Sequence, residues 1–326
     1  MDGEIRPELR ALRERLERTL DEARAQARDR RHAQGYRTAR ENVADLADAG
    51  SFQEYGQLAV AAQRSRRDYL DLQTSTAADG VITGTCTINA ALVGAQRARA
   101  GIIVNDYAVL AGTQGFFHHR KLDRICELAR ELSLPLVMYT EGGGGRPGDT
   151  DVTTQIAGLN SRSFSTWAAL SGQVPRIAVN NGYCFAGNAA LFGCADFCIA
   201  TRSSWIGMAG PAMIEGGGMG KHEPTAIGPI EVQERNGVVD IVAEDEAHAT
   251  ALAKQLLSYF RAPCRHGNRR RRKHCAMPSP RTGAGATRCG RSSRRSPMRV
   301  RSWKCSVFTG AASLPVLSGS KASRSP

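Results

Sequence analysis

From Gly80 onward, short apolar runs alternate with segments whose apolar residues recur every three to four positions. The apolar runs predict buried β-strands, and the periodic segments predict helices that cover them. Together they predict a mixed α/β sheet; successive units of this kind are consistent with an α/β spiral, although no sequence repeat establishes one. We expect strands over Val81–Thr87, Ile102–Leu110, Leu134–Thr140, Ile177–Asn181, Phe197–Thr201 and Val238–Ala243, and helices over Arg120–Leu132, Ile156–Leu170, Ala186–Cys194 and Glu246–Tyr259.

The first 50 residues carry a different pattern. Leu9, Leu12, Leu16 and Leu20 recur at helical spacing among Arg and Glu, which predicts one long amphipathic helix. A second helical segment is expected over Thr38–Asp48. The N-terminus has no apolar core of a signal peptide, and no run approaches the ~18 apolar residues needed to span a bilayer. We therefore expect a cytoplasmic protein with no membrane partner.

The charges divide the chain into two unlike pieces. Residues 1–260 hold 27 Lys and Arg against all 31 Asp and Glu, a formal charge of −4, whereas the remaining 66 residues carry 17 basic groups and no carboxylate. Ordinary composition would place roughly eight acidic residues in a segment of that length. The net charge of +13 therefore describes the tail and does not indicate a nucleic-acid-binding enzyme. The first piece is long enough for one large domain with a substantial core.

Two glycine-rich turns, each entered from an apolar run, carry the strongest functional signal. Leu134–Thr140 leads into EGGGGR at 141–146, and Arg176–Asn181 leads into GYCFAGN at 182–188, followed by a helix-like segment. A buried strand that ends in glycines and restarts as a helix leaves backbone N–H groups unpaired. Two such turns on neighbouring strands predict a site that stabilises an enolate or oxyanion with main-chain donors and no side-chain nucleophile.

Other candidate chemistry has plainer interpretations. The EGGGGR turn lacks the Gly-Lys-Ser/Thr ending of a nucleotide-binding loop. His118 and His119 point about 100° apart on a helix without a nearby carboxylate, so we expect a position at the surface or at the edge of a ligand site, and no metal site. Trp167 and Phe164 are expected in the core rather than in a substrate lid. The methionines of Gly207–Gly220 leave two alternatives open, an acyl pocket or a surface loop. No disulfide framework fits Cys86, Cys126, Cys184, Cys194 and Cys198, which we expect to be reduced core residues.

Several longer segments follow one another in a specific order. They are RTARENVADLADAGSFQEYGQL (37–58), TAADGVITGTCTINAALVG (76–94), NDYAVLAGTQGFFHHRKLDRICELA (105–129), EGGGGR (141–146), GYCFAGNAALFGCADFCIA (182–200), MAGPAMIEGGG (208–218) and GVVDIVAEDEAHATALAKQLLSY (237–259). Together they resemble the N-terminal half of the carboxyltransferase component of biotin-dependent acyl-CoA carboxylases, the family of acetyl-, propionyl- and methylcrotonyl-CoA carboxylases. The resemblance covers about residues 37–260.

The resemblance implies a crotonase-like fold and a reaction that needs no catalytic dyad. In this family carboxybiotin, carried by a partner domain, releases CO2, and the enolate of an acyl-CoA attacks it. The implied enolate hole falls on Gly187 and Asn188 with the flanking Ala186, and CoA-side support falls on Gly143, Gly144, Gly145 and Arg146. Asn188 stands where the family usually has a second glycine, and Glu141 where it has Asp. The implied partners are biotin carboxyl carrier and biotin carboxylase components, in a homo-oligomer.

The parts of the chain outside the resemblance affect the activity that we expect. We expect an N-terminal helix over 1–36, the carboxyltransferase domain over 37–260 and a disordered Arg/Ser-rich tail over 261–326. Because the resemblance stops abruptly, we favour a reading-frame shift as the origin of the tail, and we expect little turnover from this chain alone. Two alternatives remain: another crotonase-fold acyl-CoA enzyme, such as a hydratase or decarboxylase, or a non-catalytic remnant whose basic tail binds nucleic acid.

Overall fold

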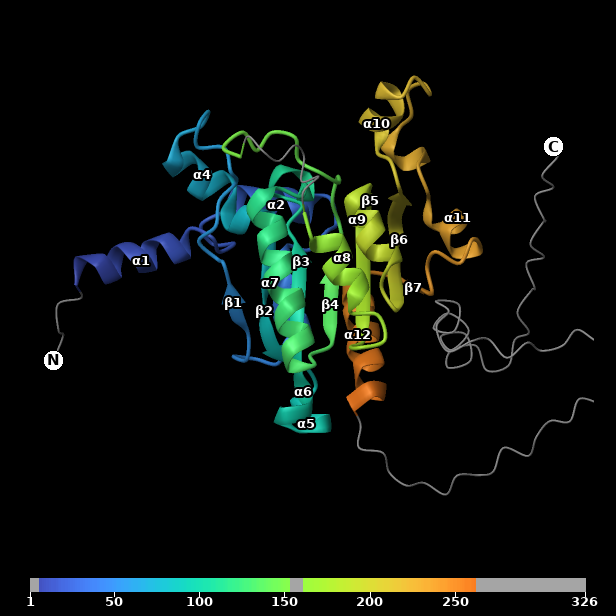
Figure 1. The fold of residues 1–326 in the computed structure, drawn as a ribbon, viewed down its shortest axis with the longest axis horizontal. Coiled ribbons are helices and arrows are strands. Elements are labelled where there is room, and N and C mark those ends of the chain that lie inside the picture. Colours follow the sequence, from blue (N-terminus) through green and yellow to red (C-terminus); the bar gives the residue numbers. More distant parts are fainter. Residues whose placement is uncertain (1–5, 153–160, 262–326) are drawn as a thin grey trace, which may run out of the picture. The chain divides into compact units, whose positions relative to one another are not determined.

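The computed structural model describes residues 6–152 and 161–261, which belong to one compact unit. Its centre is a seven-stranded sheet in which each strand pairs with the next one along the chain (Figure 1). The first three strands are antiparallel, and the pairings from the third strand to the seventh are parallel. The strands are β1 (Gln53–Tyr55), β2 (Val81–Thr87), β3 (Arg99–Asn105), β4 (Leu136–Tyr139), β5 (Arg176–Phe185), β6 (Phe197–Gly207) and β7 (Ile241–Ala243).

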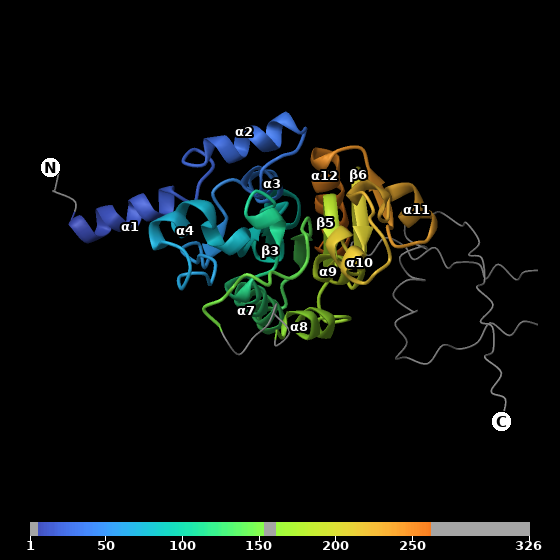
Figure 2. The same ribbon diagram turned by 90° about the horizontal axis from the view of Figure 1, so that it is seen from above.

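Helices cover both faces of this sheet, as the sequence pattern predicts. Figure 2 shows α3 and α12 on one side and α7 and α8 on the other. Successive side chains of a strand point to opposite faces, so Ile102 and Val104 join the core under α3 and α12, while Ile103 joins the core under α7 and α8. The helices are α1 (Pro7–Glu17), α2 (Ala25–Ala33), α3 (Ala39–Leu46), α4 (Tyr69–Ser75), α5 (Ala90–Val93), α6 (Ala95–Ala98), α7 (Phe116–Leu132), α8 (Ser163–Ala169), α9 (Gly187–Gly193), α10 (Pro211–Gly216), α11 (Ile230–Arg235) and α12 (Glu246–Arg261).

The single long N-terminal helix predicted from the leucine spacing is wrong. The chain forms α1 and α2 with turns between them, and α1 has no buried residue. Leu9 and Leu12 are exposed and only Leu16 and Leu20 are half-buried, so little packing favours one continuous helix. The second predicted helix is present as α3, where Thr38 and Glu41 form a reciprocal capping box.

The predicted strands exist, but β5 and β6 run further than the apolar runs indicate. Gly182, expected to open the second turn, instead lies within β5 at a positive φ of 87°, where the register with β6 shifts. A Cβ at Gly182 would lie 2.4 Å from Oε1 of Glu141, so only glycine fits this close approach. The strand therefore bends at Gly182 and continues to Phe185, which moves the second turn to Ala186 and Gly187.

Two other boundaries differ from the sequence pattern. The strand expected over Ile102–Leu110 ends at Asn105, because Asp106 accepts a hydrogen bond from the Ala108 N–H at 3.0 Å and turns the chain. The helix expected over Ile156–Leu170 lies partly outside the described residues, and its described part is α8. The predicted tail lies outside the described residues beyond position 261, so its disorder and its origin stay predictions.

Candidate functional site

The two glycine turns lie side by side. They follow β4 and β5, which are parallel neighbours, so both turns leave the sheet at its carboxyl edge. Gly142 and Cys184 form a parallel bridge, in which the Gly142 N–H donates to the Tyr183 carbonyl at 2.7 Å and the Phe185 N–H donates to the Gly142 carbonyl at 2.9 Å. The last residues of β5 thus hold the first glycine turn against the second. This agrees with the expectation that turns after neighbouring strands lie together.

The Asn188 side chain connects the two turns directly. Its Oδ1 accepts a hydrogen bond from the Gly144 N–H at 3.0 Å, and its Nδ2 donates to the Thr140 carbonyl at 3.1 Å. The side chain is fully buried, so these bonds are shielded from water. Sequence reasoning gave a role to the Asn188 backbone N–H alone; the residue type also matters, because a glycine here could not make either bond.

Most N–H groups of the first turn are already paired. The Gly143 N–H donates to the Ala111 carbonyl at 3.0 Å, and the Gly144 N–H is held by Asn188. Within residues 6–152 and 161–261, the Gly145 N–H has no hydrogen-bond partner. Of the predicted substrate-binding glycines, Gly145 alone therefore presents an available backbone donor.

The second turn supplies further unpaired donors. The Ala186 N–H donates to the Gly207 carbonyl at 2.9 Å, and α9 begins with no side-chain cap. The N–H groups of Gly187 and Asn188 consequently have no partner within the described part of the chain. Ala186 has φ 50° and ψ −118°, a conformation that non-glycine residues rarely adopt. Such a strained residue between a strand and a helix is frequent at functional sites.

Arg146 is placed differently from the prediction of a CoA contact. Its guanidinium pairs with Asp79, lies 3.5 Å from Asp149 and donates to the Thr113 carbonyl at 2.7 Å. The side chain is 5% exposed, and burial raises the pKa of Asp79, which the Arg146 charge opposes. Arg146 therefore fixes the end of the first turn from inside the protein.

Sequence reasoning missed the ion pair that supports the start of the same turn. The Arg31 guanidinium, from α2, binds the Glu141 carboxylate through two hydrogen bonds of 3.0 Å and 2.7 Å. Burial raises the pKa of Glu141 to about 7 although Arg31 opposes this shift. The two residues are 110 positions apart, and Arg31 lies in an Arg-rich segment that resembles a solvated helix face, so no local signal identifies the pair.

The adjacent histidines are buried, so the predicted surface position is wrong. Burial lowers the pKa of His119 to about 4, with a smaller contribution from the Arg146 charge, and lowers the pKa of His118 far below its usual value. His119 Nδ1 lies 3.0 Å from the hydroxyl of Ser163, which donates to Asp123 at 2.8 Å. Ser163 is 1% exposed and cannot serve as a nucleophile. No cluster of metal ligands occurs among the described residues.

Gln114 is a further polar residue beside the turns. Its side chain is 1% exposed, and its Nε2 has no hydrogen-bond partner among the described residues. Its Oε1 lies 2.4 Å from the point where a Cβ of Gly187 would stand. Phe164 also approaches Gly187 and is 38% exposed, whereas Trp167 is buried as predicted. Sequence reasoning missed Gln114, because no local pattern identifies a buried amide beside a turn with unpaired N–H groups.

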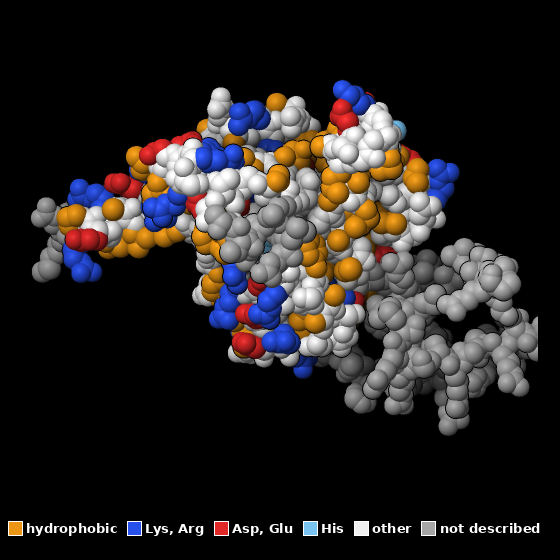
Figure 3. Space-filling view, turned by 45° about the horizontal axis from the view of Figure 1, so that its top comes forward, with side chains coloured by type: hydrophobic (Ala, Val, Ile, Leu, Met, Phe, Trp, Pro, Cys, Tyr) orange, Lys and Arg blue, Asp and Glu red, His pale blue; other side chains and the backbone are white. Residues whose placement is uncertain are grey.

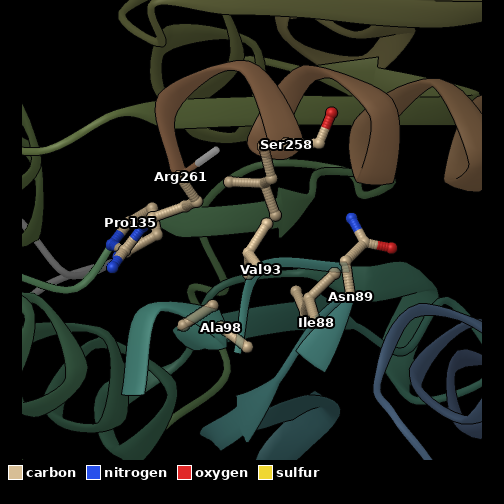
Figure 4. A pocket seen from close by; sticks show the side chains of 9 residues that line it. Ile88, Asn89, Val93, Ala98, Pro135, Ser258 and Arg261 are labelled. Atoms are coloured by element: carbon tan, nitrogen blue, oxygen red, sulfur yellow. The ribbon is translucent and has the colours of Figure 1, made fainter. Parts of the chain in front are cut away.

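One cavity lies away from the glycine turns. The cavity in Figure 4 is lined by Ile88, Val93, Ala98 and Pro135, at the start of β4, which is the amino edge of the parallel strands. Ligands of open α/β sheets bind at the opposite edge, where the glycine turns are. On the face in Figure 3, hydrophobic side chains gather below the α10 segment. Three methionines in and around α10, Met208, Met213 and Met219, are exposed.

A comparison with protein families decides the classification. The carboxyl transferase domain family matches residues 30–284. The chain belongs to this family. The matched range includes the whole segment from 37 to 260 in which the sequence motifs lie.

Named relatives of this carboxyl transferase domain agree with the family. The methylmalonyl-CoA carboxyltransferase 12S subunit of Propionibacterium freudenreichii subsp. shermanii is 30% identical over 236 residues, 71% of this chain and 42% of the relative. The biotin-dependent long chain acyl-coenzyme A carboxylase beta4 subunit of Mycobacterium tuberculosis is 29% identical over 257 residues, 78% of this chain and 46% of the relative. The chain therefore spans less than half of the length of these relatives.

Solved structures confirm the crotonase-like fold. A single-chain, multi-domain long-chain acyl-CoA carboxylase is 56% identical with a TM-score of 0.76, over 79% of this chain and 25% of that chain. The transcarboxylase 12S structure, described as a hexamer, is 26% identical with a TM-score of 0.64, over 79% of this chain and 48% of that chain. None of the helices in the described part of the chain is long and apolar enough to cross a membrane.

Proposed function

We propose that this carboxyl transferase domain binds an acyl-CoA at the two glycine turns and holds the enolate oxygen of its thioester with backbone N–H groups. The observation that carries the proposal is the pair of turns fastened by Asn188, with unpaired N–H groups at Gly145 and Gly187. Donors fixed in place before the reaction stabilise developing negative charge at little reorganisation cost. Asn188 adds its N–H from the same turn, and Gly143, Gly144, Ala186 and Arg146 shape the site.

The chemistry is proton removal from the α-carbon followed by formation of a carbon–carbon bond. The thioester carbonyl gains negative charge as the α-proton leaves, and the N–H groups of Gly145 and Gly187 offset that charge. Carboxybiotin on a partner domain supplies the CO2 and the base. The unpaired N–H groups of this chain are suited to the oxygen of an acyl thioester. They do not by themselves form a site for biotin, so we assign biotin binding to the partner domain. Burial keeps His118 and His119 neutral near pH 7, so neither adds a charge beside the turns.

We propose a long-chain acyl-CoA as the substrate. The support is the 56% identity to a long-chain acyl-CoA carboxylase together with the surface next to the turns. The segment with Met208, Met213 and Met219 begins at Gly207, whose carbonyl accepts the Ala186 N–H. Methionine side chains are unbranched and adaptable, and they suit contact with a flexible alkyl chain. This favours the acyl-pocket alternative for the methionines.

We further propose that the complete activity needs the portion that this chain does not span. The relatives are about twice as long, and several are named as subunits of biotin-dependent carboxylases. Biotin carboxylase, a biotin carrier and further copies of the protein are the partners that this inference implies. A site that binds acyl-CoA without the second reactant forfeits the proximity contribution, worth roughly 7–11 kcal/mol. Robust carboxylation of an acyl-CoA by carboxybiotin with this chain alone would contradict this part.

The test is calorimetric binding of octanoyl-CoA to the full chain and to Gly187→Pro. Proline removes the N–H proposed as donor. We expect the variant to lose roughly threefold to tenfold in affinity, since a hydrogen bond to a neutral carbonyl is worth about 0.5–1.5 kcal/mol. Circular dichroism checks that the variant is folded. Equal affinities of two folded proteins would overturn the proposed site.

A further inference from the structure

We infer that the side-chain amide of Gln114 is an additional donor to the thioester oxygen of the acyl-CoA. The inference rests on the proposed function, because it assigns a further residue to the same site. It starts from a side chain that is 1% exposed and whose Nε2 has no hydrogen-bond partner among the described residues. Leaving a buried amide unpaired is destabilising, and a ligand that accepts its hydrogen bond would remove that cost.

The backbone of Gln114 is fixed to the first glycine turn. Its N–H donates to the Gly144 carbonyl at 2.7 Å, and its carbonyl accepts the Arg146 N–H at 2.9 Å. These two bonds form a parallel bridge between Gln114 and Gly145. In such a bridge the N–H of Gly145 itself points away from Gln114, and it remains free among the described residues. The base of the Gln114 side chain is therefore held beside one of the two proposed donors.

The tip of the same side chain lies beside the other donor. The Gln114 Oε1 lies 2.4 Å, and its Cδ 3.3 Å, from the point where a Cβ of Gly187 would stand. A half-turn of the terminal amide about the Cγ–Cδ bond exchanges its oxygen and nitrogen and places Nε2 beside Gly187, and this rotated amide is the donor that we assign. Any side chain at position 187 would collide with the amide. Gln114 thus extends from Gly145 to Gly187, and the absence of a Cβ at Gly187 leaves room for it.

The amide complements an enolate better than a carbonyl. A thioester carbonyl oxygen has two lone pairs, which the N–H groups of Gly145 and Gly187 and the Gln114 amide share. An enolate oxygen carries a full negative charge and a third lone pair, and a neutral N–H2 group can donate to it without altering the charge of the site. A donor whose bond strengthens as the enolate forms contributes to the rate rather than to binding alone.

The test compares two ligands that differ by one oxygen. Octanoyl-CoA carries the thioester oxygen, whereas the thioether S-octyl-CoA lacks it. Affinities of the full chain, Gln114→Leu and Gln114→Glu are measured by calorimetry, with Gln173→Leu, an exposed glutamine, as the matched control. We expect Gln114→Leu to bind the thioester roughly threefold to tenfold more weakly and the thioether with unchanged affinity. Gln114→Glu, which cannot donate when ionised, should lose at least as much.

The melting temperature of the ligand-free protein gives a second test, because a purely structural role of Gln114 would predict a different result. Replacing an unpaired buried amide by leucine removes a destabilising group, so ligand-free Gln114→Leu should melt at the same or a higher temperature than the wild type. Equal losses for both ligands, or a lowered melting temperature, would assign Gln114 to structure and overturn the inference. Unchanged thioester affinity in Gln114→Leu would overturn it while the proposed function stands. If the wild type binds neither ligand, the proposed function and this inference both fail.

Discussion

The Asn188 Oδ1 accepts a hydrogen bond from the Gly144 N–H at 3.0 Å, across 44 positions of sequence. This bond fixes the distance between two turns that belong to different strands. Because the Asn188 Nδ2 also binds the Thr140 carbonyl at the end of β4, one side chain positions both the exit of the strand and the turn that follows it. The unpaired donors of the site depend on this arrangement.

Asn188→Ala should therefore lower both stability and acyl-CoA affinity. The change leaves a buried N–H at Gly144 and a buried carbonyl at Thr140 unpaired, at a cost of about 2–4 kcal/mol in the free energy of unfolding. Urea denaturation measures the loss. The control is Asn236→Ala, at an exposed position after α11, which should leave stability nearly unchanged. A variant at 188 as stable as the wild type would show that the two turns are held by other contacts.

Two glycines of α9 should respond in opposite ways to alanine. A Cβ at Gly187 meets the Gln114 Oε1 at 2.4 Å, whereas at Gly193 it meets nothing within 4 Å. We expect Gly187→Ala to displace Gln114 and weaken octanoyl-CoA binding. Gly193→Ala should keep the affinity and raise stability by about 0.5–1 kcal/mol, because alanine loses less backbone entropy in a helix. Calorimetry and thermal melting of both variants check this, and equal ligand affinities in the two would count against the site.

The Asp79–Arg146 ion pair should be far more important for stability than an exposed one. Both side chains are at most 5% exposed, and Asp79 Oδ2 also accepts the His118 N–H at 2.7 Å. Asp79→Asn leaves the buried Arg146 charge poorly compensated, which we expect to cost about 3–5 kcal/mol in unfolding free energy. Glu244→Gln removes the exposed pair with Arg202 and should not shift the melting temperature measurably. Similar shifts for both variants would contradict this assignment.

Protonation of the buried histidines should lower the free energy of unfolding as the solution is acidified, while Glu141, whose pKa burial raises to about 7, contributes in the opposite direction. Burial lowers the pKa of His119 from 6.5 to about 4, so between these values the unfolded chain binds more protons than the folded one. His119 therefore contributes stability above pH 6.5 that is lost toward pH 4, about 3 kcal/mol in total, and His118 acts in the same direction.

The corresponding experiment follows urea unfolding at pH 7, 5.5 and 4.5. His119→Asn keeps an amide near Ser163 but cannot be protonated, so its unfolding free energy should decline less steeply with acid than that of the wild type. His222→Asn, at an exposed histidine, should follow the wild-type curve. If the slopes of wild type and His119→Asn coincide, the loss of stability has another origin.

The sequence by itself determined the alternation of strands and helices, and the glycine turns that follow two of the strands. These features are local: apolar runs of strand length, helical periodicity and the backbone freedom of glycine are all read from neighbouring residues. The same kind of local spacing placed both Trp167 and Phe164 in the core; this prediction is confirmed for Trp167 and wrong for Phe164, which is 38% exposed.

Only the tertiary structure decided which groups are paired and which are free. Asn188 with Gly144, Arg31 with Glu141 and Asp79 with Arg146 join residues that are 44, 110 and 67 positions apart. Sequence spacing contains no information about such contacts, because the sheet brings them together only after every strand has taken its place. The burial of His118 and His119 and the extension of β5 past Gly182 have the same origin. Packing decides whether a polar group faces water or the core, and thus which N–H groups remain available to a substrate.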